Sequence, residues 1–447
     1  MELPVVQPSN VTVMIKPVGA LCNLDCHYCY YLPTTSLYEH REHRMSLDTL
    51  EAVFASILPR FADEVTIAWQ GGEPTLAGLD FFRKAIEFQR KYQRPGQHVS
   101  HCLQTNGTLL DDAWCEFLRR HGFLIGLSID GPARYHDHYR LTRRQKGSFE
   151  QVLRGLHLLQ KHRVEHNLLT VLNDRNVKCP EEIYGFLYNL GCRHMQFIPA
   201  IEWLDKGDNQ FELQPFSPRA DAYGRFLCKV FDLWFERHRD HVSVRIFDVV
   251  LNRLVLGRTP LCIMDASCHG QLTLEHDGAV FGCDHFVNRR WQLGQIGDPA
   301  WRNPIAANNS QMIDLDFSDR SVDDHVMQQL QNSTAVADSG PRLDADWLDR
   351  VDRQRLGFFA SRKQNLPEKC HACQWKAFCY GGCPKHRPSR GETPEPTALC
   401  EGYMMFFEHA MPRMQWLAGF LRMNQQPPAP APAPGKSSGK RQNKPKR

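Results

Sequence analysis

Short runs of β-branched and aromatic residues alternate with amphipathic windows through the first 240 residues of the chain. The runs predict strands at residues 11–15, 65–69, 98–104, 124–129, 165–172 and 194–199. Apolar positions three and four apart predict helices at residues 46–58, 79–92, 111–120, 148–161, 181–190 and 218–238. Strand–helix units in this order indicate an α/β fold with a parallel sheet, right-handed crossovers and the curvature of a partial or full barrel. Ligands in such sheets bind at the carboxyl ends of the strands.

Two serines mark expected helix starts. Ser46 stands directly before an apolar-periodic window and is expected to act as its N-cap. Ser148 is followed three residues later by Gln151, which is the spacing of a capping box. Between these two positions, His136 and His138 flank Asp137, and we expect them in a surface loop rather than around a metal ion.

The pattern changes near residue 260 to turn-rich sequence that is dense in cysteine. We therefore expect a barrel over residues 1–240 and a second domain over 241–415 that is organised by metal. Residues 303–352 are expected to form a solvated insertion, because ten aspartates fall between positions 314 and 352. Residues 425–447 run from a Pro-Ala alternation into a basic tip and predict a disordered tail.

Charge and cysteine content limit the classes of protein to which the chain can belong. The formal net charge is +4, but residues 436–447 carry six basic side chains and no acid, which leaves −2 for the rest of the chain. No basic face for nucleic acid is expected, and the tail is interpreted as a solubilising segment. The chain opens without a signal sequence and has no apolar run of roughly 18 residues, so we expect a cytoplasmic protein without a membrane span. Sixteen cysteines in a reducing compartment point to metal.

Three cysteines, Cys22, Cys26 and Cys29, form a loop directly after the first predicted strand. Three thiolates can hold three irons of a cubane cluster and leave the fourth iron without a protein ligand, whereas a structural site is normally closed by a fourth ligand. His27 is an alternative fourth ligand, although one turn cannot easily aim four donors at one metal. A redox pair of Cys26 and Cys29 is the other alternative.

The second domain holds eight further cysteines, enough for two sites with four ligands each. By spacing alone they fit two zinc ribbons as well as two iron–sulfur clusters. These residues are Cys262, Cys268, Cys283, Cys370, Cys373, Cys379, Cys383 and Cys400. The other five, which lie singly in strand and helix patterns and are expected to pack as small hydrophobes, are Cys102, Cys115, Cys179, Cys192 and Cys228.

The cysteine loop carries Tyr28, Tyr30 and Tyr31, and the second predicted strand ends in Gly71-Gly72-Glu73-Pro74. This combination resembles the radical S-adenosylmethionine (SAM) superfamily. The resemblance implies a partial (β/α)6 TIM-like barrel in which the open iron chelates the methionine moiety of SAM.

The same resemblance implies a SAM site. The Gly71-Gly72-Glu73 turn would hold the methionyl amine, with Glu73 as an anionic acceptor. Tyr28 would lie near the adenine. Ser128 and Arg140 fall where relatives contact the ribose and the carboxylate.

The later cysteines resemble a SPASM domain, which radical enzymes acting on peptides carry after the barrel. This resemblance favours iron–sulfur over zinc and implies three [4Fe–4S] clusters in all. The first auxiliary cluster would be held by Cys262, Cys268, Cys283 and Cys383. The second would be held by Cys370, Cys373, Cys379 and Cys400.

Within this superfamily the chain is similar to the anaerobic sulfatase-maturating enzymes, from Val11 to about Cys400. The similarity rests on the cysteine loop, Trp69-Gln70, Gln104-Thr105-Asn106-Gly107, Ser-Ile-Asp-Gly-Pro, Lys-Gly-Ser-Phe and Cys283-Asp284. It implies oxidation of a Cys or Ser side chain in a sulfatase segment to Cα-formylglycine. Asp284 would be the base, with either partial burial raising its basicity or the adjacent substrate radical acidifying the proton that it takes. Gln70 and Tyr30 would position the substrate.

The expected partners are an unfolded or nascent sulfatase with a Cys/Ser-x-Pro/Ala-x-Arg segment and an electron donor such as flavodoxin or ferredoxin. Two alternatives stay open. One is another SPASM maturase that forms thioether or carbon–carbon crosslinks; only about ten residues precede the first strand, where such enzymes often carry a recognition domain. The other is a non-catalytic zinc or iron–sulfur protein. The sequence does not distinguish Cys-type from Ser-type substrates.

Overall fold

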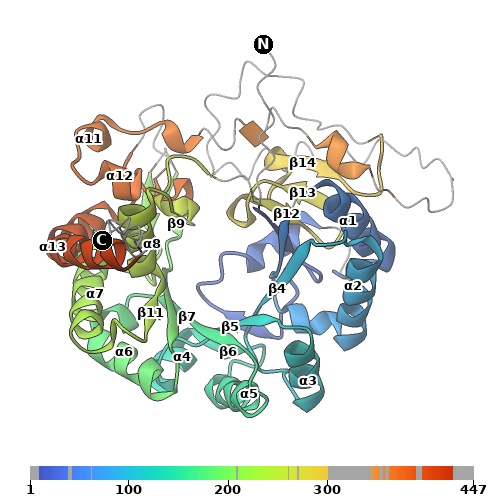
Figure 1. The fold of residues 1–447 in the computed structure, drawn as a ribbon, viewed down its shortest axis with the longest axis horizontal. Coiled ribbons are helices and arrows are strands. Elements are labelled where there is room, and N and C mark those ends of the chain that lie inside the picture. Colours follow the sequence, from blue (N-terminus) through green and yellow to red (C-terminus); the bar gives the residue numbers. More distant parts are fainter. Residues whose placement is uncertain are drawn as a thin grey trace, which may run out of the picture.

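The computed structural model describes most of the barrel and the parts of the second domain that surround its cysteines (Figure 1). The described residues are 10–38, 43–61, 63–207, 210–259, 261–268, 271–300, 344, 346–351, 356–357, 362–388 and 395–425. Most of the insertion and nearly all of the tail lie outside these ranges, so the predictions for them stay predictions.

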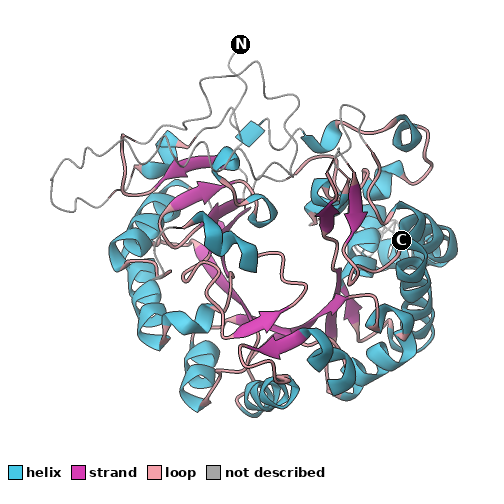
Figure 2. Cartoon of the chain, turned by 180° about the vertical axis from the view of Figure 1, so that it is seen from behind, coloured by secondary structure: helices cyan, strands magenta, loops and turns pink. Residues whose placement is uncertain are grey.

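Six parallel strands in sequence order form the barrel wall. They are β1 (Asn10–Ile15), β3 (Glu64–Trp69), β4 (His98–Thr105), β5 (Leu124–Ser128), β7 (His166–Leu172) and β8 (His194–Pro199). The helices that cover their outer face are α1 (Leu47–Arg60), α2 (Leu79–Tyr92), α3 (Asp112–Arg120), α5 (Phe149–Lys161), α6 (Pro180–Asn189) and α7 (Ala220–Leu233). The curved sheet stays open on one side, with loops on its concave face (Figure 2). The predicted α/β fold and partial barrel are confirmed.

The second domain continues the barrel sheet instead of starting a new one. Strand β12 (Leu272–Leu274) pairs in parallel with β1, and β13 (Ala279–Phe281) and β14 (Gln292–Gln295) follow it antiparallel. The parallel strand β11 (Ser243–Val244) lengthens the opposite edge beside β8. Because β1 lies next to β12, residues that follow β1 lie beside the cysteine-rich domain.

The remaining elements are short, except for two helices. The small strands are β2 (Leu24–Cys26), β6 (Arg140–Thr142), β9 (Trp203–Asp205) and β10 (Phe211–Leu213). The further helices are α4 (Ala133–Tyr139), α8 (Arg245–Leu256), α11 (Glu368–His371), α12 (Lys376–Cys379) and α13 (Cys400–Gln425). Helix α13 packs closely on α7, since a Cβ at Gly402 would lie 2.3 Å from the carbonyl oxygen of Ala220. The division into domains stays a prediction, although α13 crosses the expected boundary at 415.

Helix boundaries confirm one cap and correct another. Ser46 accepts a 3.0 Å hydrogen bond from the Thr49 amide and caps α1 as predicted. Ser148 does not cap α5 with its side chain, because its hydroxyl donates to the Arg140 carbonyl at 2.7 Å. The carboxylate of Asp137 accepts from the Ser148 and Phe149 amides instead, both at 2.8 Å.

Two further expectations need correction. The window at 218–238 is not one α-helix, because α7 ends at Leu233 and a π-helical turn follows at Trp234–His238. The described end of the acidic insertion is not solvated throughout. Trp347 is buried against α1 and donates from Nε1 to the Ala52 carbonyl at 3.1 Å.

Candidate functional site

The cysteine loop is tied to the turn that ends β3. The Gly72 amide donates to the Gly19 carbonyl at 2.8 Å, and the Glu73 amide donates to the Leu21 carbonyl at 2.9 Å. A Cβ at Gly72 would lie 2.1 Å from the Leu21 carbonyl oxygen, and Gly71 has a positive φ of 120°. Glycines are therefore needed here because the two backbones approach too closely for a side chain.

Glu73 anchors this turn to the end of β4. Its fully buried carboxylate accepts from the Thr75 amide at 3.0 Å, the Thr75 hydroxyl at 2.6 Å, the Thr105 hydroxyl at 2.7 Å and the Asn106 amide at 2.8 Å. Burial raises the pKa of Glu73, and these hydrogen bonds offset part of the rise. The structure thus gives Glu73 a scaffolding contact with β4 in addition to the amine-binding role expected for it.

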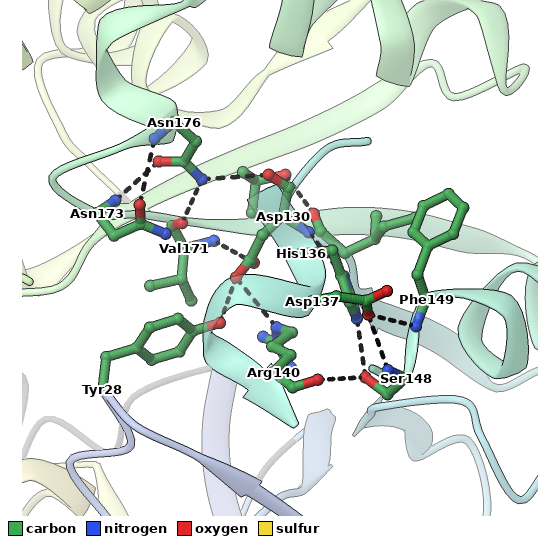
Figure 3. Close-up of polar contacts among 12 residues, drawn as sticks. Tyr28, Asp130, His136, Asp137, Arg140, Ser148, Phe149, Val171, Asn173 and Asn176 are labelled. Atoms are coloured by element: carbon green, nitrogen blue, oxygen red, sulfur yellow. Dashed lines mark hydrogen bonds and ion pairs between the residues drawn. The ribbon is translucent and has the colours of Figure 1, made fainter. Parts of the chain in front are cut away.

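A buried carboxylate that the sequence reading did not single out, Asp130, joins the expected adenine and carboxylate contacts (Figure 3). It accepts a hydrogen bond from the Tyr28 hydroxyl and from the Val171 amide at 3.0 Å, and it pairs with Arg140 Nε at 3.2 Å. Arg140 lies directly opposite Cys26 in the β2–β6 ladder. Tyr28 and Arg140 are therefore fixed beside the cysteine loop through Asp130.

Behind Asp130 lies a second buried group. His136 is fully buried, and its Nδ1 accepts from the Asp130 amide at 3.3 Å while its Nε2 lies 3.1 Å from the Ser148 hydroxyl (Figure 3). Burial and the Arg140 charge hold the pKa of His136 well below its usual range. The expected surface loop is thus wrong, because His136 and His138 both lie in helix α4, although His138 is exposed.

The three cysteines of the loop suit a metal cluster. Burial raises the pKa of Cys22 to about 11 and that of Cys26 to about 12, and the neighbouring thiols add to both shifts. Thiols of this kind become thiolates when a metal displaces their protons. The His27 side chain is exposed, and the His27 amide donates to the Tyr139 carbonyl at 3.1 Å; its role as a fourth ligand stays an open alternative.

Ser128 and Gln70 lie at the carboxyl ends of their strands, the edge where ligands bind. Ser128 is the last residue of β5 and is buried. Gln70 directly follows β3, is partly exposed, and donates its amide to the Ile15 carbonyl at 3.0 Å. Both residues therefore face the same end of the barrel as the cysteine loop.

The first auxiliary set gathers four cysteines from distant parts of the second domain. Although Cys262 is exposed overall, desolvation of its thiol and the charges of Cys383 and Cys268 together raise its pKa to about 12. Burial also raises the pKa of Cys283, and the charges of Asp284, Cys383 and Cys262 contribute to the rise. Cys383 thus lies close enough to the earlier cysteines to raise the pKa of Cys262 and Cys283, and the assignment of all four to one cluster stays a prediction.

The second auxiliary set lines one cavity. Its volume is about 330 Å³, and its walls include Trp375, Tyr403 and Phe407. All four expected ligands reach it: Cys370, Cys373, Cys379 and Cys400. Four convergent thiols in a cavity between α11, α12 and the start of α13 fit a closed cluster.

Asp284, which directly follows Cys283, contacts the cysteine loop that follows β1. Its carboxylate accepts a 2.6 Å hydrogen bond from the hydroxyl of Tyr30, which belongs to the cysteine loop. Burial alone raises the pKa of Asp284, but His285, Lys16 and the Tyr30 hydroxyl together lower it below its ordinary value. Asp284 is thus held as a carboxylate but is not made more basic, so of the two expected routes the geometry favours the one in which the adjacent radical acidifies the substrate proton.

The five cysteines without an expected ligand role lie apart from these sets. Cys115 and Cys192 are buried in the core, as expected for small hydrophobes. The other three, which are partly exposed, are Cys102, Cys179 and Cys228.

Comparison with known proteins agrees with this geometry. The family model of the radical SAM superfamily matches residues 17–187. The chain is 34% identical over 432 residues to the serine-type anaerobic sulfatase-maturating enzyme of Bacteroides thetaiotaomicron, and the match covers 93% of each. It is 31% identical over 414 residues to the cysteine-type enzyme of Clostridium perfringens, covering 90% of this chain and 97% of the relative. The solved structure of native anSMEcpe with bound AdoMet and Kp18Cys peptide is similar with a TM-score of 0.75 and 29% identity, over 92% and 99% of the two chains.

The parallel barrel and its three-cysteine loop define a radical SAM enzyme, which uses SAM and iron–sulfur clusters. The cysteine-rich region after the barrel fits a SPASM domain. Within this class, the chain belongs to the anaerobic sulfatase-maturating enzyme family. None of the helices that the structure describes has the length and apolar composition needed to cross a bilayer.

Proposed function

We propose that this enzyme oxidises a Cys or Ser side chain in a sulfatase polypeptide to Cα-formylglycine. The observation that carries the proposal is the placement of Asp284, a carboxylate that directly follows Cys283 and is hydrogen-bonded to Tyr30 of the cysteine loop at 2.6 Å. A proton acceptor therefore lies between the loop that would hold the radical-generating cluster and the loop that would hold an auxiliary cluster.

The site residues are proposed to act as follows. Cys22, Cys26 and Cys29 hold the first cluster, and the eight later cysteines hold the two auxiliary clusters in the sets described above. Tyr28, Ser128 and Arg140, with the Gly71-Gly72-Glu73 turn, bind SAM. When bound, SAM and the first cluster would supply the radical that removes a hydrogen atom from the target Cβ, and an auxiliary cluster would accept the last electron.

Asp284 then accepts the thiol or hydroxyl proton of the substrate. Its lowered pKa means that it is ionised at neutral pH, so acidity must come from the substrate radical rather than from an unusually basic carboxylate. Tyr30 fixes the orientation of the carboxylate through its hydrogen bond. Gln70, at the end of β3, is proposed to orient the peptide.

The proposed substrate is a Cys/Ser-x-Pro/Ala-x-Arg segment that is not yet folded, since a folded sulfatase would not present its side chain to a buried radical. The free thiols and the clusters that they would hold require a reducing environment, which supports the cytoplasm as the compartment. Flavodoxin or ferredoxin is proposed as the electron donor, because radical SAM enzymes need a low-potential one-electron donor.

The test is anaerobic turnover of the reconstituted enzyme with dithionite, SAM and an 18-residue sulfatase-like peptide. Cys and Ser versions of the peptide are assayed in parallel, with an Ala version as the control. An aldehyde in the Cys or Ser peptide supports the proposal. Formation of 5′-deoxyadenosine with both peptide masses unchanged would reject this substrate and keep the radical chemistry.

A further inference from the structure

A lysine lies where the Gly71-Gly72-Glu73 turn, the cysteine loop and the second domain meet. Lys16 directly follows β1, and its side chain is 1% exposed. Its aliphatic stem packs against the Gly71-Gly72-Glu73 turn, since a Cβ at Gly71 would lie 3.3 Å from Lys16 Cβ. Its amide donates to the Leu274 carbonyl at 2.9 Å, at the end of β12.

The ammonium group is incompletely compensated among the described residues. Its Nζ lies 3.4 Å from the centre of the Tyr31 ring and 3.9 Å from Oε1 of Glu275, which is fully buried. No described residue accepts a hydrogen bond from it. The Glu275 carboxylate is already bound by the Tyr31 hydroxyl at 2.6 Å. Burying a cation raises the free energy of the folded state unless the cation is paired and hydrogen-bonded. Further negative charge near Lys16 would therefore stabilise its ammonium group.

Two cysteine loops would provide that charge once they hold clusters. Tyr31 forms one apolar cluster with Ala279 and Phe281 of β13, against which Cys29 and Tyr30 also pack, and Phe281 lies two residues before Cys283. Burial lowers the pKa of Lys16, and the charges of Glu275, Asp284, Cys283 and Cys29 raise it in part. The Tyr31 ring that the ammonium contacts is two residues from Cys29 and belongs to the same apolar cluster as Phe281, two residues before Cys283, so the ammonium lies near a ligand of each cluster.

We propose that Lys16 is the buried counter-charge shared by the cluster at Cys22, Cys26 and Cys29 and the cluster held through Cys283, and that it makes both easier to reduce. The inference rests on the cluster assignment of the proposed function. A cubane held by thiolates is an anion, and one-electron reduction adds a negative charge without moving a proton or breaking a bond. A fixed cation in a region of low dielectric stabilises the reduced form more than the oxidised form.

The test is a redox titration of the holoenzyme with dithionite, followed by electron paramagnetic resonance with and without SAM. The signal that changes on adding SAM belongs to the cluster with the open iron. Lys16→Met should make that signal and one SAM-insensitive signal at least tenfold harder to reduce, about 59 mV for a one-electron couple. Glu275→Gln removes a neighbouring negative charge and should shift both signals in the opposite direction. The control is Lys84→Met on α2, whose exposed charge should leave all signals in place.

The proposal is overturned if Lys16→Met leaves every potential unchanged, or if both variants shift the signals in the same direction, as general loosening would. If Lys16→Met does not assemble its clusters, Glu275→Gln decides alone: a shift to easier reduction supports the proposal, and any other result rejects it. These potentials are measured without peptide. A wild-type enzyme that is reduced as expected but makes no aldehyde would therefore fail the proposed function and leave this inference standing.

Discussion

The Asp130–Arg140 pair offers a quantitative test of the site's architecture. Asp130 is fully buried and the Arg140 side chain is 9% exposed, with 3.2 Å between Nε and the carboxylate. Asp130→Asn keeps the shape but leaves a buried guanidinium without its counter-charge, and the Tyr28 hydroxyl loses a charged acceptor. Breaking a buried pair by removing one partner costs roughly 3–5 kcal/mol, so we expect a loss of that size in the free energy of unfolding.

The assay is urea-induced unfolding of the wild-type chain, Asp130→Asn and a matched control. Asp112→Asn is the control, because Asp112 pairs with Lys161 at 2.6 Å while their side chains are 58% and 63% exposed. An exposed pair contributes little to stability, so this variant should unfold close to the wild type. If Asp130→Asn is no less stable than Asp112→Asn, the buried pair does not hold the SAM site together and the reasoning fails.

Two substitutions probe the cluster loop and its neighbouring turn. Cys22→Ala should abolish SAM cleavage and lower the iron content by one cluster, because the other two sets of cysteines are independent; loss of all iron on analysis would contradict the three-site division. Gly72→Ala places a Cβ 2.1 Å from the Leu21 carbonyl oxygen and should strongly reduce deoxyadenosine formation. Gly185→Ala in α6, where a Cβ meets nothing within 4 Å, should leave the rate unchanged, and equal rates in the two alanine variants would argue against the steric account.

The strands of the barrel were predictable because each is a short run with apolar residues that is followed by a helical window. The run at 194–199 matches β8 residue for residue, and the window at 79–92 matches α2. The helix at 218–238 was predicted too long, because its amphipathic pattern persists through a π-turn that only tertiary packing selects. Trp347 was expected to be solvated together with its acidic neighbours. Composition alone does not reveal that this one aromatic residue packs on α1.

The candidate site was predictable where a motif lies within one loop, and not where it is assembled from distant residues. The capping of α5 by Asp137 could not be inferred from the Ser148 spacing, because the carboxylate comes from eleven residues upstream. Asp130 contacts Tyr28 across 102 positions of sequence, and Lys16 meets Glu275 through the pairing of β1 with β12. Asp130 lies two residues after β5 and Lys16 lies directly after β1, and this place at the carboxyl edge of the sheet was the signal that could have marked both.

The central claim is that Asp284 accepts the substrate proton after hydrogen abstraction. The most direct test is the ratio of peptide aldehyde to 5′-deoxyadenosine formed by the wild-type enzyme and by Asp284→Asn, with SAM and the sulfatase-like peptide under anaerobic conditions. The account predicts that Asp284→Asn still forms deoxyadenosine while its ratio falls at least tenfold, because radical formation does not need the carboxylate. A wild-type ratio in Asp284→Asn would contradict it.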